Sequence, residues 1–172
     1  MDIPQEHQEV LVAMGVAVLL LQTTERVIRL CMTLVLQKDQ PLTLEKLQQQ
    51  EESERNKTLG YFLSELRKRV DLDQHFDQLL KDFLKNRNDF IHNLNNVPAW
   101  GFRKHQNVLA SREFVYQLIH QSENVTKVFA ALISAWVEHN KLDVPVPDHE
   151  YFDEIETTFK PVVDRIFFAK DP

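Results

Sequence analysis

Residues 72–94 read LDQHFDQLLKDFLKNRNDFIHNL, and their apolar side chains recur every three or four positions. The apolar members of this stretch are Leu72, Phe76, Leu79, Leu80, Phe83, Leu84, Phe90, Ile91 and Leu94. Such spacings place the side chains on one broad stripe of an α-helix, whereas a half-buried strand would alternate at every second residue. We expect this helix to start at Asp71 and to end at the asparagines before Pro98, because Asn and Pro interrupt helices.

The same helical periodicity extends over most of the chain. We expect further helices over about 5–36, 58–70, 108–140 and 148–169, a short one near 43–47, and a kink at Pro161. The sequence shows no internal repeat, no strand-like alternation and no linker long enough to separate domains. It therefore predicts an all-α fold, a single bundle of about five helices in one domain covering residues 1–172.

The first expected helix contains an uncharged apolar run over residues 10–21. A membrane-spanning helix needs about 20 apolar residues, and this run has 12. We therefore expect the run to be buried as the central helix of the bundle. The N-terminal sequence MDIPQE is acidic and lacks the positive region of a secretory signal, so we expect a cytoplasmic protein without a membrane partner.

Several classes of functional site are missing from the sequence. The three glycines stand apart, so no glycine-rich phosphate loop can be written, and no Gly-x-Ser-x-Gly elbow occurs. The single cysteine, Cys31, excludes a disulfide framework and a cysteine-only zinc site, and we expect it to be a small buried apolar residue. No two of the seven histidines are three or four residues apart, and no Glu-x-x-His occurs. We therefore expect no metal and no cofactor.

The net charge of −6 argues against a protein that coats nucleic acid, because such proteins carry a basic footprint. The acidity is unevenly distributed along the chain. Residues 138–172 hold nine acidic and four basic side chains, whereas residues 51–105 hold nine acidic and ten basic ones. The middle of the chain is thus nearly neutral, and its charge permits a small cleft that grips one phosphate at a time.

Polar residues interrupt the apolar stripe near its end. Arg87 follows Phe83 by four residues, so a permanently charged guanidinium lies on or beside the stripe, which is costly unless it meets an anion or a water-filled cleft. His92 shares a helix face with Asn88 and Asp89. Arg87 and His92 differ by about 140° around the helix and about 7.5 Å along it, so the long arginine can partly cross the gap. Asp89 could orient His92 or lie in solvent, and we favour solvent.

This arrangement, Arg87-Asn88-Asp89-Phe90-Ile91-His92, resembles the signature of the HEPN superfamily, an Arg followed by a polar residue and, four to six residues on, a His. The resemblance implies a HEPN-like all-α bundle with the motif near the end of an inner helix. Many members are metal-independent endoribonucleases of toxin–antitoxin, CRISPR and phage-defence systems that act as dimers around one shared cleft. One branch carries a modified Tyr two residues after the His. Leu94 stands there instead, which argues against a simple two-gene toxin.

The resemblance and the chemistry together suggest a ribonuclease with catalytic residues Arg87, His92 and Asn88. Histidine titrates near neutrality and suits proton transfer, and arginine can hold two phosphate oxygens at once. Each chain offers one such histidine, so two proton transfers are met most simply by a homodimer. Partners would be RNA and a protein antitoxin or regulator.

The loop after the motif supplies candidate RNA-binding residues, Arg103, Lys104 and Trp100, since cations hold phosphate and an aromatic ring can stack on a base. The competing interpretation is that Trp100 and Phe102 only pack the loop onto the bundle. Two other functions remain open. The same fold could be a catalytically silent interaction or regulatory module. A DNA-binding regulator could use residues 44–66 as a helix-turn-helix, although few basic side chains are available there.

Overall fold

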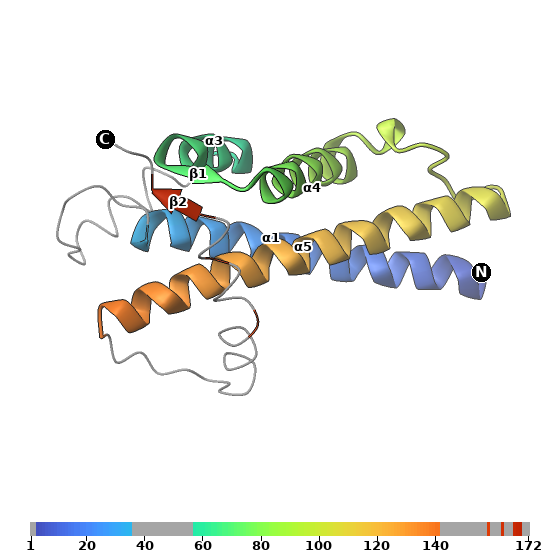
Figure 1. Cartoon of the computed structure of the whole chain (residues 1–172). Coiled ribbons are helices and arrows are strands. Elements are labelled where there is room, and N and C mark those ends of the chain that lie inside the picture. The colour runs from blue at the N-terminus through green and yellow to red at the C-terminus, as the bar shows by residue number, and fades with distance from the viewer. Residues whose placement is uncertain (1–2, 36–56, 142–157, 159–162, 164–166, 170–172) are drawn as a thin grey trace. The chain divides into compact units, whose positions relative to one another are not determined.

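The computed structural model describes residues 3–35, 57–141, 158, 163 and 167–169. Figure 1 shows that helices dominate these residues, which confirms the all-α class. The part of the chain that the structure describes contains four α-helices rather than five. They are α1 (Gln5–Leu34), α3 (Leu59–Arg69), α4 (Gln74–His92) and α5 (His105–His139), with a 3₁₀ turn η1 (Leu94–Asn96) after α4.

Two short strands depart from the predicted all-helical pattern. Strand β1 (Val70–Leu72) pairs antiparallel with β2 (Phe167–Ala169), with Val70 opposite Ala169 and Leu72 opposite Phe167. The predictions that a helix starts at Asp71 and that another reaches Ala169 are therefore wrong. The cause is a pairing between distant segments, which local periodicity does not encode. The short helix near 43–47 and most of the segment 148–166 lie outside the described residues.

The chain divides into two compact units. The first unit comprises residues 1–24 and 78–125, and the second comprises residues 25–77 and 126–172. Helices α1, α4 and α5 each contribute residues to both units. The candidate site lies entirely in the first unit.

The core of the first unit is made by stripes from three helices. Its fully or nearly buried apolar side chains are Val10, Ala13, Ala17 and Leu21 of α1, Leu80, Phe83 and Phe90 of α4, and Val108, Val115, Leu118, Ile119 and Val125 of α5. The small residues Ala13 and Ala17 leave room for a close neighbour. The Thr24 hydroxyl donates to Leu20 O (2.8 Å) and is also within 3.3 Å of Ser122 O, which ties α1 to α5. Asn86 Nδ2 donates to Gln121 Oε1 at 3.0 Å, which ties α4 to α5.

The prediction that the apolar run 10–21 forms a buried central helix is wrong, because the run is not buried on all sides. Leu11, Val12, Val16, Val18 and Leu19 are exposed to solvent. Periodicity fails here because a run with no polar face does not indicate which side meets the core. Helix α1 is also long and apolar enough to cross a membrane by length and composition, with 28 % of its most apolar window buried.

The second unit has its own aromatic core. Phe62, Leu63 and Leu66 of α3 are buried, and the rings of Phe76 and Phe129 lie 6.2 Å apart. The Arg29 guanidinium stacks over the Phe62 ring at 5.1 Å. Cys31 is fully buried as predicted, and burial raises the pKa of its thiol far above the ordinary range, so the thiol stays protonated and unreactive.

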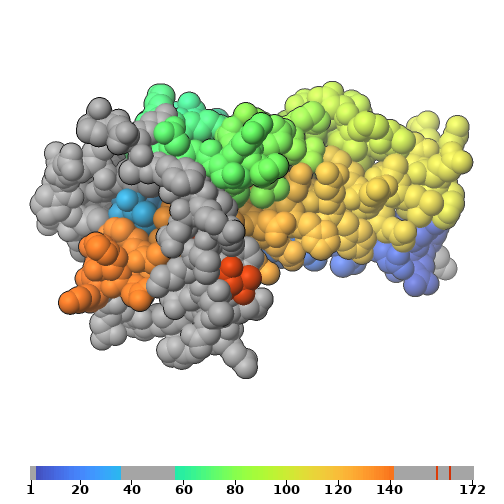
Figure 2. All heavy atoms as spheres, viewed as in Figure 1, coloured from blue at the N-terminus to red at the C-terminus, as the bar shows by residue number. Residues whose placement is uncertain are grey.

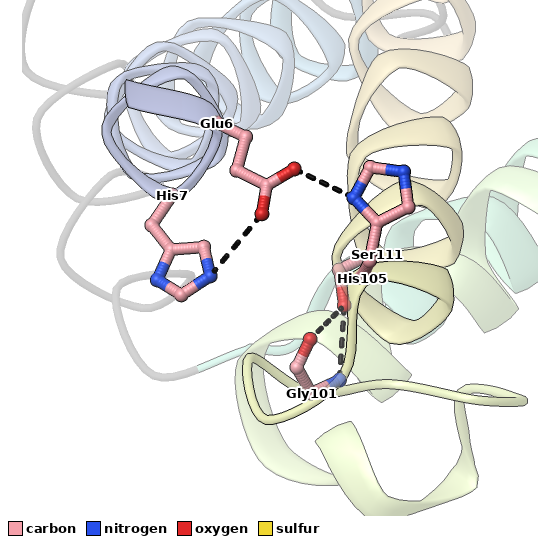
Figure 3. A network of polar contacts seen from close by, with 5 residues as sticks. All are labelled: Glu6, His7, Gly101, His105 and Ser111. Carbon is pink, nitrogen blue, oxygen red and sulfur yellow. Dashed lines mark hydrogen bonds and ion pairs between the residues drawn. The ribbon is translucent and has the colours of Figure 1, made fainter. Parts of the chain in front are cut away.

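A polar clamp joins residues 97–104, the loop between η1 and α5, to α5 within the first unit (Figure 3). The Gly101 N–H donates to Ser111 Oγ at 3.0 Å, and the same hydroxyl lies 3.3 Å from Gly101 O. Gly101 has φ of 150°, a conformation that suits glycine. Beside this pair, Glu6 of α1 lies between two imidazoles, with Oε2 2.7 Å from His105 Nδ1 and Oε1 3.9 Å from His7 Nε2.

Two buried serines of α5 allow the clamp to be tested. Ser111→Ala leaves the Gly101 N–H without its partner, so we expect a loss of about 1–3 kcal/mol in the free energy of unfolding, measured by urea denaturation. Ser122→Ala is the matched control, because Ser122 is equally buried but its hydroxyl donates to Leu118 O of its own helix. Equal losses in the two variants would show that the clamp contributes nothing specific.

Candidate functional site

Three motif side chains meet at the C-terminal end of α4. Arg87 Nη1 donates to Asn88 Oδ1 at 3.0 Å and lies 3.4 Å from His92 Nε2. Arg87 and Asn88 are half-buried, and His92, the last residue of α4, is exposed. The long side chain of Arg87 therefore spans the separation between residues 87 and 92 around and along the helix, and reaches the His92 imidazole. The structure brings the three predicted catalytic residues together in one chain.

The contact between Arg87 and His92 joins the guanidinium to the imidazole at 3.4 Å. A guanidinium can only donate hydrogen bonds, so Nε2 of His92 is the acceptor in the tautomer that makes this contact a hydrogen bond. Asn88 presents its carbonyl oxygen to Arg87, which leaves its Nδ2 amide protons for another acceptor.

Asp89 neither lies in solvent nor is hydrogen-bonded to His92, the two alternatives that the sequence suggested. It keeps 8 % of its surface exposed, so the expectation that it lies in solvent is wrong. It accepts hydrogen bonds from Asn96 Nδ2 at 3.1 Å and from Lys85 Nζ at 3.0 Å. These bonds, that from Asn96 first, lower the pKa of the Asp89 carboxyl below its ordinary value of 3.8. The carboxylate thus fastens η1 to the end of α4, beside the motif.

Asn96 is the residue of this region that the sequence analysis missed. It follows Asp89 by seven residues and lies in η1, beyond the end of α4. Helical spacing cannot predict this contact, because the chain has left the helix before it reaches Asn96. The only sequence signal was the cluster of asparagines itself, which indicated a helix end but no partner.

The three candidate RNA-binding residues of the following loop differ in their exposure to solvent. Arg103 and Lys104 are exposed. Trp100 is half-buried, with its ring in edge contact with those of Phe102 at 6.2 Å and Phe114 at 6.1 Å. Trp100 therefore packs against neighbouring aromatic rings, as one of its two interpretations predicted. Its RNA-binding role stays a prediction.

The turn that enters the loop restricts its conformation. Trp100 N donates to Val97 O at 3.2 Å, with Pro98 and Ala99 between them. Ala99 has φ of 55°, so the turn has the positive φ at its third position that a type II turn requires. Proline at the second position of the turn and the Ser111 clamp after it hold the loop in one place.

Among the described residues, no group of three or more His, Cys, Asp or Glu side chains is placed to hold a metal ion. The chemistry available at the end of α4 is that of a guanidinium, an amide and an imidazole.

Comparison of the chain with protein-family models, with curated proteins and with solved structures found no match.

Asp89→Asn tests the anchor beside the motif. Because the folded-state pKa is lowered, the charged carboxylate stabilises the fold above its ordinary pKa, and this contribution is lost as the pH falls through the folded-state pKa. At pH 7 we expect the variant to lose about 1–2 kcal/mol of unfolding free energy, measured by urea denaturation. The difference from the parent chain should shrink on the acid side of pH 4.

Asp82→Asn is the matched control for the anchor. Asp82 is an exposed carboxylate of the same helix that accepts one bond from Gln78, and its substitution should change the stability little. A loss in Asp89→Asn that stays constant from pH 7 to pH 3 would contradict the electrostatic role of Asp89.

Proposed function

We propose that the chain is a metal-independent endoribonuclease of HEPN type, which cleaves RNA by attack of its own 2′-hydroxyl. The observation that carries the proposal is the contact of Arg87 with both Asn88 and His92 at an exposed helix end. It places a guanidinium, which can bind phosphate, beside an imidazole. A cytoplasmic role in toxin, phage-defence or stress-response systems belongs to the same proposal.

The reaction requires one exchange of bonds at phosphorus. The 2′-oxygen forms a bond to phosphorus as its proton passes to a base, and the bond to the 5′-oxygen breaks as that oxygen receives a proton. Arg87 moves from His92 Nε2 to the scissile phosphate, where a guanidinium stabilises the developing negative charge. This movement frees the Nε2 lone pair to accept the 2′-hydroxyl proton. Asn88 Nδ2 donates to a second phosphate oxygen.

The second proton transfer calls for a second acid. In this proposal it is His92 of another copy of the chain, related by a two-fold axis, since each motif supplies one histidine. A homodimer with two motifs around one phosphate provides both a base and an acid without a metal. A protein antitoxin or regulator would act by covering this cleft.

A catalytically silent interaction module is the second candidate, and the exposed apolar side chains of α1 favour it. A DNA-binding regulator has less support. The helix-turn-helix interpretation rests largely on residues outside the described ranges, and the basic run after it is engaged within the protein. Arg67 bonds to Asp77 at 2.6 Å, Lys68 to Glu65 at 2.6 Å, and Arg69 to Met32 O at 3.5 Å.

The catalytic proposal predicts distinct losses for two motif variants. We expect His92→Ala to lower the cleavage rate at least about a hundredfold, because a positioned acid or base contributes on that scale. Arg87→Lys retains the charge but loses the two-pronged contact, so cleavage should also fall strongly. The measurement is cleavage of total RNA by purified protein in excess chelator, resolved on a gel.

His120→Ala is the control for these variants, because His120 is an exposed histidine of another helix, α5, and pairs with Glu123 rather than with a motif residue. It should cleave at the parent rate. Circular dichroism would establish that every variant is folded. Cleavage that persists unchanged in both motif variants would assign the activity to a contaminant, and no cleavage by any chain would favour the silent module.

The loop cations predict a separable effect on binding. In a chain with Arg103→Ala and Lys104→Ala, we expect weaker binding of single-stranded RNA and a smaller dependence of affinity on salt, since fewer phosphates are neutralised. The bond-breaking step with saturating RNA should change little. Fluorescence anisotropy at several salt concentrations provides the measurement. An unchanged salt dependence would remove Arg103 and Lys104 from the RNA-binding surface.

A further inference from the structure

The Asp89 carboxylate has two kinds of partner within reach at the end of α4. Side chains three positions apart are neighbours on a helix, so the His92 imidazole belongs to the same face as Asp89. The structure pairs the carboxylate otherwise. Its Oδ1 accepts from Asn96 Nδ2 at 3.1 Å, and its Oδ2 accepts from Lys85 Nζ at 3.0 Å. Both oxygens of Asp89 thus already accept a hydrogen bond, and His92 contacts Arg87 instead.

The position of Asn96 is set by the backbone of η1 as well as by Asp89. Asn96 N donates to Asn93 O at 2.8 Å. Val97 N donates to Leu94 O at 3.1 Å, and the Val97 side chain is buried. The turn is therefore closed by its own hydrogen bonds and fixed at its end by a buried neighbour. It presents the Asn96 amide to Asp89 as a donor that carries no charge.

The two possible contacts of His92 require different forms of its imidazole. An imidazole that carries a proton on both nitrogens has no lone pair, so it cannot accept a hydrogen bond from the Arg87 guanidinium. A carboxylate partner favours this doubly protonated form, because it is positively charged. Pairing of His92 with Asp89 therefore competes with its contact to Arg87. Asn96 occupies Asp89 without adding a group that titrates in this range.

We infer that Asn96 is a positioning residue, which keeps the Asp89 carboxylate from pairing with His92 and so leaves the imidazole in contact with Arg87. Its consequence for catalysis rests on the proposed function, in which the unprotonated imidazole takes the proton of the 2′-hydroxyl. Asn96 acts through Asp89 and has no direct part in that step. The state of the motif thus depends on a residue beyond the end of the motif helix.

The inference is tested by following the His92 imidazole by NMR in the full chain without RNA, from about pH 5 to about pH 8. The His92 signals are identified by their absence from His92→Ala. In Asn96→Ala the Asp89 Oδ1 is released to His92. We therefore expect His92 to lose its proton at a pH about half a unit higher than in the parent chain, the scale of an exposed ion pair.

Asn95→Ala is the matched control, because Asn95 is an exposed asparagine of the same turn. Its His92 signals should titrate as in the parent chain. Circular dichroism should show Asn95→Ala and Asn96→Ala folded, since both side chains belong to exposed residues of a surface turn.

A double variant separates the attraction of the carboxylate from a loosening of the turn. In Asn96→Ala combined with Asp89→Asn, the carboxylate is gone, so His92 should titrate at the parent pH or below it. A merely structural role of Asn96 would make no such distinction between the single and the double variant. The comparison isolates Asp89, because the other charged groups of this part of α4 and of the following loop are unchanged: Lys85, Arg87, Arg103 and Lys104.

Cleavage of RNA provides a second readout. If His92 is the base, a titration shifted by half a pH unit lowers the rate about threefold on the acid limb of the pH profile. We expect this loss in Asn96→Ala near pH 6, and we expect it to disappear near pH 8, where His92 is unprotonated in every variant. A uniform loss at both pH values would come from a damaged site.

Three NMR outcomes would overturn the inference. They are an Asn96→Ala chain whose His92 titrates as in the parent, a shift that persists in the double variant, and an equal shift in Asn95→Ala. All three are measured without RNA, so the inference and the proposed function are judged separately. A parent chain that cleaves no RNA would end the proposed function, whereas an active parent with an unshifted His92 in Asn96→Ala would end the inference alone.

Discussion

The first unit depends on one buried stripe of α5. Val108, Ser111, Val115, Leu118 and Ser122 recur every three or four residues along it and are almost wholly excluded from solvent. The loop 97–104, α1 and α4 each bond to α5 at a different residue of this stripe or next to it. Ser111 holds the loop, Ser122 O receives the hydroxyl of α1, and the adjacent Gln121 binds Asn86 of α4. Figure 2 shows the surface of α5 in this unit between those of α4 and α1. The position of the motif helix is a consequence of that packing.

The motif is placed by the way α4 ends. The helix presents Arg87 near its buried side and His92 at its last, exposed turn, and the arginine joins them. Asp89, which could have competed for either side chain, is occupied by Asn96 and Lys85. The Arg87–Asn88–His92 group therefore lies at the end of α4 as a guanidinium, an amide and an imidazole in contact, while the neighbouring Asp89 carboxylate is bonded elsewhere.

Most of the helices could be predicted from the sequence. The long helix expected over 108–140 extends over 105–139, because its buried stripe is regular and long. The strand at Val70–Leu72 could not be predicted, since it exists through pairing with Phe167–Ala169 at the far end of the chain. The exposure of Leu11 and Leu19 was also hidden, because a run without polar residues carries no information about which face is outside. In the candidate site, the helical spacing and the motif resemblance predicted the group of Arg87, Asn88 and His92, whereas the partner of Asp89 lies in a turn that spacing does not describe.

The most direct measurement of the central claim concerns the chemistry of cleavage. A short RNA cut by the purified chain in excess chelator is compared with the same RNA carrying one 2′-deoxynucleotide immediately 5′ of the scissile phosphate. Attack by the 2′-hydroxyl predicts that the all-ribose strand yields a 2′,3′-cyclic phosphate and a 5′-hydroxyl end, and that the deoxy substitution abolishes cleavage at that position alone. Cleavage of both strands at equal rates, or products with a 5′-phosphate, would contradict the account.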